Sequence, residues 1–181
     1  MKKFLVAVIG LCALVVATPL LAAKPVPEPS AWDKVAAMLQ FMREEEKLAH
    51  DVYALFDTIY GKQTNTFSNI AVSEQRHTDA VRALLDKYDV ADPAANTAPG
   101  EFENDELQAL YTDLVNIGKQ GLTQALEVGV AIEKKDMTDI VVAIDLSVGY
   151  ADIVQVYSHL LAGSESHLDG FLKALATVGD D

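Results

Sequence analysis

The sequence predicts an all-α bundle of four long helices, with a fifth, shorter helix inside a long crossover connection. Apolar residues repeat at spacings of three and four, and no stretch alternates with the period of two that marks a half-buried strand. Beyond residue 31, proline occurs only at Pro93 and Pro99, so little else interrupts the helical pattern. The four long windows cover roughly residues 32–60, 67–88, 120–144 and 150–176.

The connections between these windows set the order of the bundle. Short links at residues 61–66 and 145–149 predict that the helices they join run antiparallel. The connection over residues 89–120 is long enough to return the chain to the opposite end of the bundle. Its first part, residues 89–100, is rich in Asp, Ala, Asn and Pro and predicts a loop. Helical spacing resumes over about residues 103–117, which predicts the short extra helix.

Residues 1–23 have the pattern of a secretory signal peptide, because two lysines precede an apolar run from Phe4 to Leu21 that ends in small residues. A retained membrane anchor is the competing interpretation, since the run approaches spanning length. The Pro-rich segment that follows, residues 24–31, favours cleavage. We therefore expect an exported protein, periplasmic or extracellular, with one domain over residues 32–176 and a short tail over 177–181.

Composition excludes one class of partner and limits the sources of stability. The chain has 14 Lys and Arg against 27 Asp and Glu, a net charge of −13, so it lacks the basic face that nucleic acid requires. Loss of the signal peptide would leave 12 basic residues against 27 acidic ones, a net charge of −15, and no cysteine. We expect no disulfide and, after cleavage, no membrane association; core packing, bound metal or both must stabilise the fold.

The second long helix carries the most informative polar pair. Its apolar stripe, the line of apolar residues along one helix face, is interrupted at Glu74 and His77. A carboxylate and an imidazole three residues apart point the same way from one helix, as two ligands of one metal must. The Glu-x-x-His pattern is weak by itself, and its place in the stripe strengthens it, because an unpaired charge buried there costs several kcal/mol.

The other three long helices also present polar residues where an apolar one is expected. Glu46 fills the first helix's stripe, with Glu45 one residue round as a competitor; Glu133 and Asp136 share a face of the third, and Ser164 and His167 a face of the fourth. The alternative is that these are half-exposed polar residues near the bundle ends. The predicted metal ligands are Glu46, Glu74, His77, Glu133, Asp136 and His167.

The predicted donor set indicates the class of metal. Carboxylate oxygens and imidazole nitrogens without a thiolate suit iron or manganese, and zinc stays open because it accepts the same donors. A carboxylate can bridge two ions, whereas an imidazole cannot.

These residues resemble the ferritin-like superfamily, in particular rubrerythrin-like proteins and a group of small, often exported bacterial and archaeal domains. The resemblance covers about residues 33–175 and implies a four-helix bundle with one long crossover and a two-metal carboxylate site, with two iron ions expected. It is carried by residues 42–49, 51–53, 69–77 and 129–136, by Gly163 and Ser164, and by His167 and Leu168.

The resemblance also favours one first-helix ligand and exposes two departures. Glu46 lies seven residues before Tyr53, as the corresponding ligand does in rubrerythrin-like proteins, which favours Glu46 over Glu45. Ser164 stands where the family carries a carboxylate, so Asp136 is the candidate to supply the missing oxygen. The Cys-rich segment that supplies electrons in rubrerythrin is absent from the sequence.

Together these observations predict an exported metal-binding protein that oxidises Fe²⁺ or reduces peroxide, with metal ions and O₂ or peroxide as its partners. Glu46 and Glu74 would ligate or bridge, His77 and His167 would each fix one ion, and Glu133 with Asp136 would complete the oxygen ligands. Two alternatives stay open: a non-catalytic protein that holds a single metal for storage or sensing, and a metal-free ferritin-like scaffold that acts through its acidic surface. A homodimer also stays open.

Overall fold

The structure is a computed structural model that describes residues 28–178, and every regular element in this range is a helix. The expected fold class is confirmed, and each helix boundary falls within two residues of its predicted window. The predicted signal peptide, residues 1–23, lies outside the described residues. The helices are α1 (Ala31–Tyr60), α2 (Thr66–Tyr88), α3 (Asp105–Gly118), α4 (Leu122–Leu146) and α5 (Ala151–Val178).

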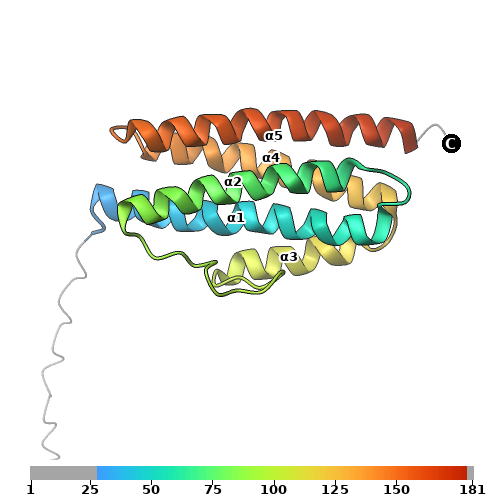
Figure 1. Cartoon of the computed structure of the whole chain (residues 1–181), viewed down its shortest axis with the longest axis horizontal. Coiled ribbons are helices and arrows are strands. Elements are labelled where there is room, and N and C mark those ends of the chain that lie inside the picture. Colours follow the sequence, from blue (N-terminus) through green and yellow to red (C-terminus); the bar gives the residue numbers. More distant parts are fainter. Residues whose placement is uncertain (1–27, 179–181) are drawn as a thin grey trace, which may run out of the picture.

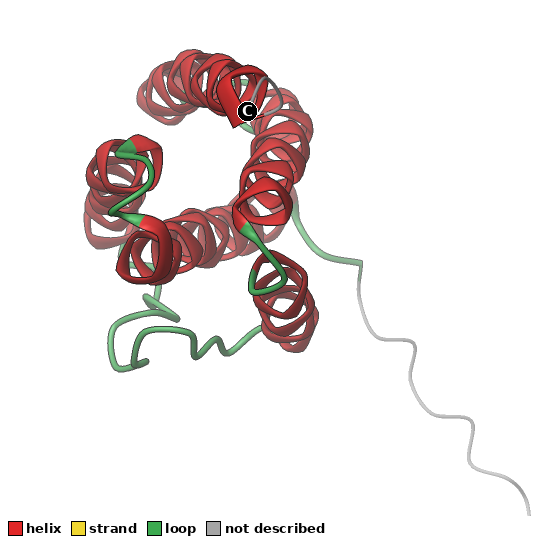
Figure 2. Ribbon diagram, turned by 90° about the vertical axis from the view of Figure 1, so that its right-hand side faces the viewer, coloured by secondary structure: helices red, strands yellow, loops and turns green. Residues whose placement is uncertain are grey.

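The four long helices form a ring, which Figures 1 and 2 show from the side and from the end. Helix α1 packs against α2 and α4, and α5 closes the ring by packing against the same two helices. The short helix α3 lies outside the ring, against α1 and α4. A side chain that projects from one long helix toward the centre therefore lies near side chains from the other three.

The bundle has two apolar clusters, one toward each end. An aromatic cluster contains Tyr53, Phe56, Phe67 and Phe171, all with no exposed surface. An aliphatic cluster toward the other end contains Leu39, Met42, Val81, Ile140 and Leu160. Each long helix contributes to both clusters, so each helix has a middle turn that belongs to neither.

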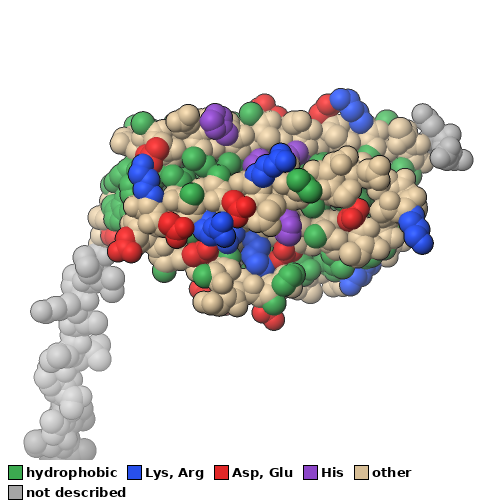
Figure 3. Space-filling view, in the orientation of Figure 1, with side chains coloured by type: hydrophobic (Ala, Val, Ile, Leu, Met, Phe, Trp, Pro, Cys, Tyr) green, Lys and Arg blue, Asp and Glu red, His purple; other side chains and the backbone are tan. Residues whose placement is uncertain are grey.

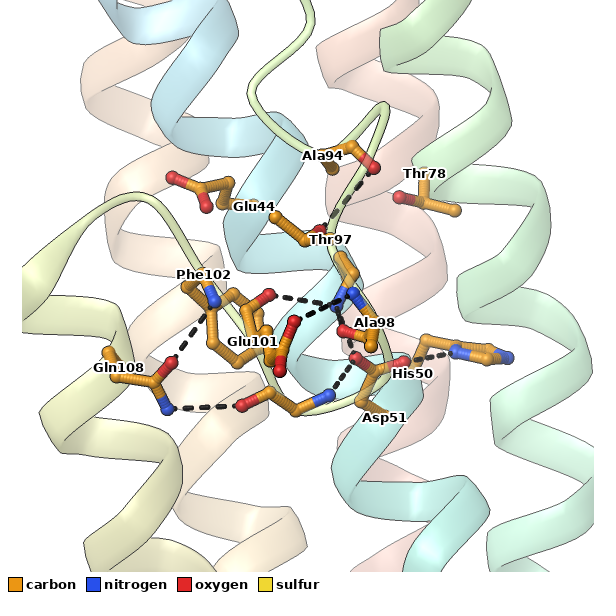
Figure 4. A network of polar contacts seen from close by, with 12 residues as sticks. Glu44, His50, Asp51, Thr78, Ala94, Thr97, Ala98, Glu101, Phe102 and Gln108 are labelled. Atoms are coloured by element: carbon orange, nitrogen blue, oxygen red, sulfur yellow. Dashed lines mark hydrogen bonds and ion pairs between the residues drawn. The ribbon is translucent and has the colours of Figure 1, made fainter.

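The long crossover is held against α1 by polar side chains, as Figure 4 shows. Glu44 accepts hydrogen bonds from the backbone N–H groups of Glu103 at 2.5 Å and Asn104 at 3.1 Å. Asp51 accepts the backbone N–H of Gly100 at 2.8 Å. Helix α1 thus buries polar side chains on its crossover side as well as toward the bundle centre, so burial alone does not identify a metal ligand on this helix.

Within residues 28–178, no helix combines the length and apolar character needed to cross a bilayer. Figure 3 shows acidic and basic side chains distributed over one face of the molecule rather than gathered into patches of one sign.

Candidate metal centre

The polar residues of the four middle turns form one buried layer between the two apolar clusters. Each lies, along its own helix, between a residue of the aromatic cluster and one of the aliphatic cluster. All of them are less than one-tenth exposed, with Glu46, Glu74 and Glu133 each at 1%. This polar layer consists of Glu46, Glu74, His77, Glu133, Asp136, Ser164 and His167.

Glu74 lies at the centre of the polar layer. Its Oε2 is 2.9 Å from Nδ1 of His77, on its own helix, and its Oε1 is 2.7 Å from Nδ1 of His167 on α5. The ligand atoms of these three residues all lie within 4.8 Å of one another, which is compact enough to surround one ion. The predicted Glu-x-x-His pair therefore meets the predicted fourth-helix histidine.

Each histidine also faces a second carboxylate, one from α1 and one from α4. Nδ1 of His77 lies 3.2 Å from Oε2 of Glu46, and Nδ1 of His167 lies 3.5 Å from Oε2 of Glu133. The two imidazole rings are stacked, with centroids 5.3 Å apart. The result is a near-symmetric pair of half-sites that share Glu74, one completed by Glu46 and the other by Glu133.

Glu45 and Glu46, the two candidate ligands of the first helix, face different partners. Glu45 is buried but forms an ion pair with Lys135 of α4, which also contacts Asp139 at 2.5 Å. Glu46, one residue on, directs its carboxylate toward His77. Glu46 is therefore the α1 residue of the polar layer, whereas Glu45 lies outside it.

Ser164 and Asp136 form a pair across α5 and α4. The Ser164 hydroxyl, which has no exposed surface, donates a hydrogen bond to Oδ2 of Asp136 at 2.5 Å. Ser164, where the rubrerythrin-like pattern has a carboxylate, thus holds the carboxylate of Asp136 from the neighbouring helix in place. Asp136 belongs to the polar layer, as expected, although it contacts neither histidine within ion-pair distance.

Two further residues fix the orientation of the layer. The hydroxyl of Tyr53 donates to Oε1 of Glu133 at 2.6 Å. A Cβ at Gly163 would lie 2.5 Å from Nε2 of His77, so only glycine lets this imidazole pack so closely against α5. Gly163 entered the sequence-based prediction only as part of the family resemblance, with no packing role. The available signal was a glycine in the middle of a helix, where it costs about 1 kcal/mol relative to alanine.

The carboxyl groups of the layer differ sharply in their affinity for protons. Burial, reinforced by neighbouring carboxylates, raises the pKa of Glu133 to about 7 and those of Glu46 and Asp136 well above their usual values. Burial also opposes ionisation of Glu74, but its contacts with both histidines outweigh that effect and lower its pKa to about 2. Glu74 is therefore the carboxyl group of the layer that ionises most readily, and the two histidines stabilise its negative charge.

The histidines show the complementary effect. Burial alone would lower their pKa values, but the neighbouring carboxylates raise the pKa of His77 to about 10 and that of His167 to about 9. In the metal-free layer, two protonated imidazoles thus lie beside the ionised Glu74, while the other three carboxyl groups have raised pKa values. A divalent cation would replace these protons.

Several polar atoms of the layer lack hydrogen-bond partners, and a bound cation could serve as their partner. Buried polar atoms are nearly always paired, yet Glu46 Oε1, Asp136 Oδ1 and His167 Nδ1 are buried without a hydrogen bond. The short distance from His167 to Glu74 is thus a close approach without hydrogen-bond geometry. Oxygen and nitrogen atoms that converge in this way, with no thiolate, fit a divalent cation.

Comparison with known proteins places the chain beside an archaeal relative. The model of an uncharacterized protein domain, DUF2202, matches residues 35–181. The uncharacterized protein MJ0754 of Methanocaldococcus jannaschii is 43% identical over 141 residues, which are 77% of this chain and 74% of that protein. The crystal structure of hypothetical protein MJ0754 superposes with a TM-score of 0.75 at 40% identity, covering 87% of each chain.

A more distant solved structure shows the fold class. The crystal structure of symerythrin from Cyanophora paradoxa, reduced with dithionite, matches with a TM-score of 0.58 at 15% identity, covering 86% of this chain and 89% of that one. Symerythrin is a ferritin-like four-helix bundle, so the ferritin-like fold that the sequence predicted is confirmed.

Proposed function

The chain belongs to the DUF2202 domain family and has a ferritin-like fold, and we propose that it binds two divalent metal ions, iron first among them, in the polar layer. The observation that carries this proposal is the position of Glu74 between His77 and His167, with one carboxylate oxygen directed at each ring. A carboxylate placed in this way can bridge two ions, and each half-site then has its own histidine and its own second carboxylate.

The donor set limits the choice of metal. Four carboxylates and two imidazoles suit iron or manganese, and zinc accepts the same donors. Asp136, held by Ser164, lies in the same layer and supplies the oxygen that the α5 position lacks. This arrangement supports two ions in spite of the serine.

We further propose that the iron-loaded protein is an oxidoreductase of the ferroxidase or peroxidase type. Bound iron would supply one-electron chemistry: reduction of one H₂O₂ to two H₂O would take two protons and two electrons, one electron from each of two Fe²⁺ ions that become Fe³⁺. The protein's own residues hold the ligands: Tyr53 orients Glu133 and Ser164 orients Asp136. The two apolar clusters restrict water on either side of the layer.

Metal content per chain is the first test of this proposal. The untagged chain, purified without chelator and reconstituted with Fe²⁺ or Mn²⁺, would be analysed by plasma mass spectrometry. We expect two ions per chain and their loss in Glu74→Gln, which keeps the side-chain shape but removes the charge. His159→Ala, which removes an exposed histidine of α5, is the control and should retain both ions.

Each outcome of this experiment has a definite meaning. A single ion per chain, lost in Glu74→Gln, would replace the two-ion proposal with the non-catalytic single-metal protein. Absence of specific metal after reconstitution would overturn the proposal and favour a metal-free scaffold. If two ions are bound, peroxide consumption decides the redox step: one peroxide per two Fe²⁺, faster than for Fe²⁺ in buffer, supports it, and equal rates contradict it.

A further inference from the structure

A small apolar pocket lies outside the polar layer, between α1, α3 and α4. Its walls are Leu48 of α1, Leu110 and Leu114 of α3, and Ile132 of α4. Its volume is about 70 Å³. Because Leu48 and Ile132 are only 1% and 5% exposed, the inner wall of the pocket is part of the buried core.

The pocket lies near the polar layer along two helices, α1 and α4. Ala131, which is exposed, lines its outer side. At its inner side, Ile132 directly precedes Glu133, and the lining residue Glu45 directly precedes Glu46. Two of the proposed metal ligands are therefore backbone neighbours of residues that line the pocket.

Two polar residues line the pocket, Glu45 and Lys135, and one oxygen of Glu45, Oε2, is buried without a hydrogen-bond partner. Lys135 pairs with both Glu45 and Asp139. The rest of the lining is aliphatic, so the pocket offers few of the two to four polar partners that an ordered water needs. An engineered cavity of about 150 Å³ lined by similar side chains stays dry and binds benzene or xenon. A pocket half that size is too small to enclose an aromatic ring but large enough for a diatomic gas.

We propose that this pocket, beside the polar layer, binds a small apolar molecule. Its size and aliphatic lining favour dioxygen. The physical binding requires no metal, whereas its role as a source of oxidant rests on the proposed function. Helix α3 is then more than part of a crossover, since Leu110 and Leu114 form one wall of the binding site.

Xenon tests the binding step in the metal-free chain. Methyl signals of Leu110, Leu114 and Ile132 would be followed by nuclear magnetic resonance as xenon pressure rises. We expect saturable shifts confined to the pocket, several-fold weaker in Ala131→Leu, which extends a side chain that already lines the pocket. Ala109→Leu, at an exposed α3 position outside the pocket, should respond like the wild type.

Shifts that rise linearly with pressure, spread over both apolar clusters, or persist in full in Ala131→Leu would overturn the binding proposal. The role is tested separately, by the initial rate of Fe²⁺ oxidation at varied O₂. We expect Ala131→Leu to raise the KM for O₂ several-fold with unchanged metal content; equal KM values in Ala131→Leu and Ala109→Leu would overturn the role. If the wild-type chain binds no metal, the proposed function is wrong, but the xenon titration still tests whether the pocket binds a small apolar molecule.

Discussion

In the candidate site, His77 packs so close to Gly163 that it leaves no room for a Cβ, and Gly163→Ala probes this contact directly. The added Cβ would lie 2.5 Å from Nε2 and 2.6 Å from Cε1 of the imidazole. Restoring a tolerable separation of 3.4 Å requires a movement of about 0.9 Å, measured from the 2.5 Å contact. A shift of this size takes Nδ1 of His77 out of register with Glu46 and Glu74, and displacements near 1 Å cost a preorganised site about 100-fold.

Gly170→Ala is the matched control, because Gly170 lies two turns further along the same helix. A Cβ there would meet only Cδ1 of Ile70, at an ordinary 3.6 Å. Replacing a helical glycine with alanine stabilises a helix by about 1 kcal/mol, so Gly170→Ala should raise the free energy of unfolding. In Gly163→Ala the overpacking cost of about 1–3 kcal/mol offsets that gain.

The assay is a competition titration of the metal-free chain with Fe²⁺ or Zn²⁺ against a chelating dye, with urea unfolding measured in parallel. We expect at least a tenfold weaker metal affinity in Gly163→Ala and wild-type affinity in Gly170→Ala. Wild-type metal affinity in both variants would refute the reasoning, since it would mean that Gly163 does not set the position of His77. A comparable loss in both variants would also refute it.

Three further predictions concern protonation and the hydrogen bonds around the layer. The pKa values of His77 and His167, about 10 and 9, exceed the unperturbed 6.5. The stability that these two histidines give the metal-free fold is therefore complete below pH 6.5 and is lost as pH rises through 9 to 10. The urea midpoint of the metal-free chain measures this loss, and a midpoint that stays constant across that pH range contradicts it. Metal affinity, by contrast, should rise with pH by up to about tenfold per unit for each proton displaced, as dye competition at pH 6 and 8 would show. Ser164→Ala removes the buried donor to Asp136 and should lower the free energy of unfolding by about 1–3 kcal/mol and weaken the second ion, with unchanged binding of that ion as the contradicting result. Asp51→Ala removes one of the contacts that hold the crossover against α1, at a similar cost in unfolding free energy, but should leave metal content unchanged, because Asp51 lies outside the polar layer; loss of metal would contradict that separation.

The helices and most of the polar layer could be predicted from the sequence, because a buried charged residue interrupts the apolar stripe of its helix. An apolar stripe needs an apolar residue every three or four positions, and Glu74 and His77 break that rule in the middle of α2. The same break occurs on α1, α4 and α5, and the structure brings the four breaks together. A polar residue near a bundle end leaves no comparable mark, because there it reaches water.

Periodicity did not resolve α1, and the reason is the crossover. Glu44 and Glu45 are each 3% exposed, as buried as many core residues, but they face the crossover and Lys135 rather than the bundle centre. A stripe analysis assumes one buried face per helix. Because the loop and α3 cover a second face of α1, adjacent glutamates of equal burial differ in role, and only tertiary contacts separate them.

Ser164 shows the same limit more sharply. Read along α5 alone, a serine in place of a carboxylate is a lost ligand, which favours a weaker or absent second ion. Across the α4–α5 interface, its hydroxyl donates to Asp136, so the layer keeps a fourth buried carboxylate and gains a donor that orients it. Compensation of this kind lies between helices, where no single-helix pattern can register it. The serine by itself is therefore no reason to expect one ion rather than two.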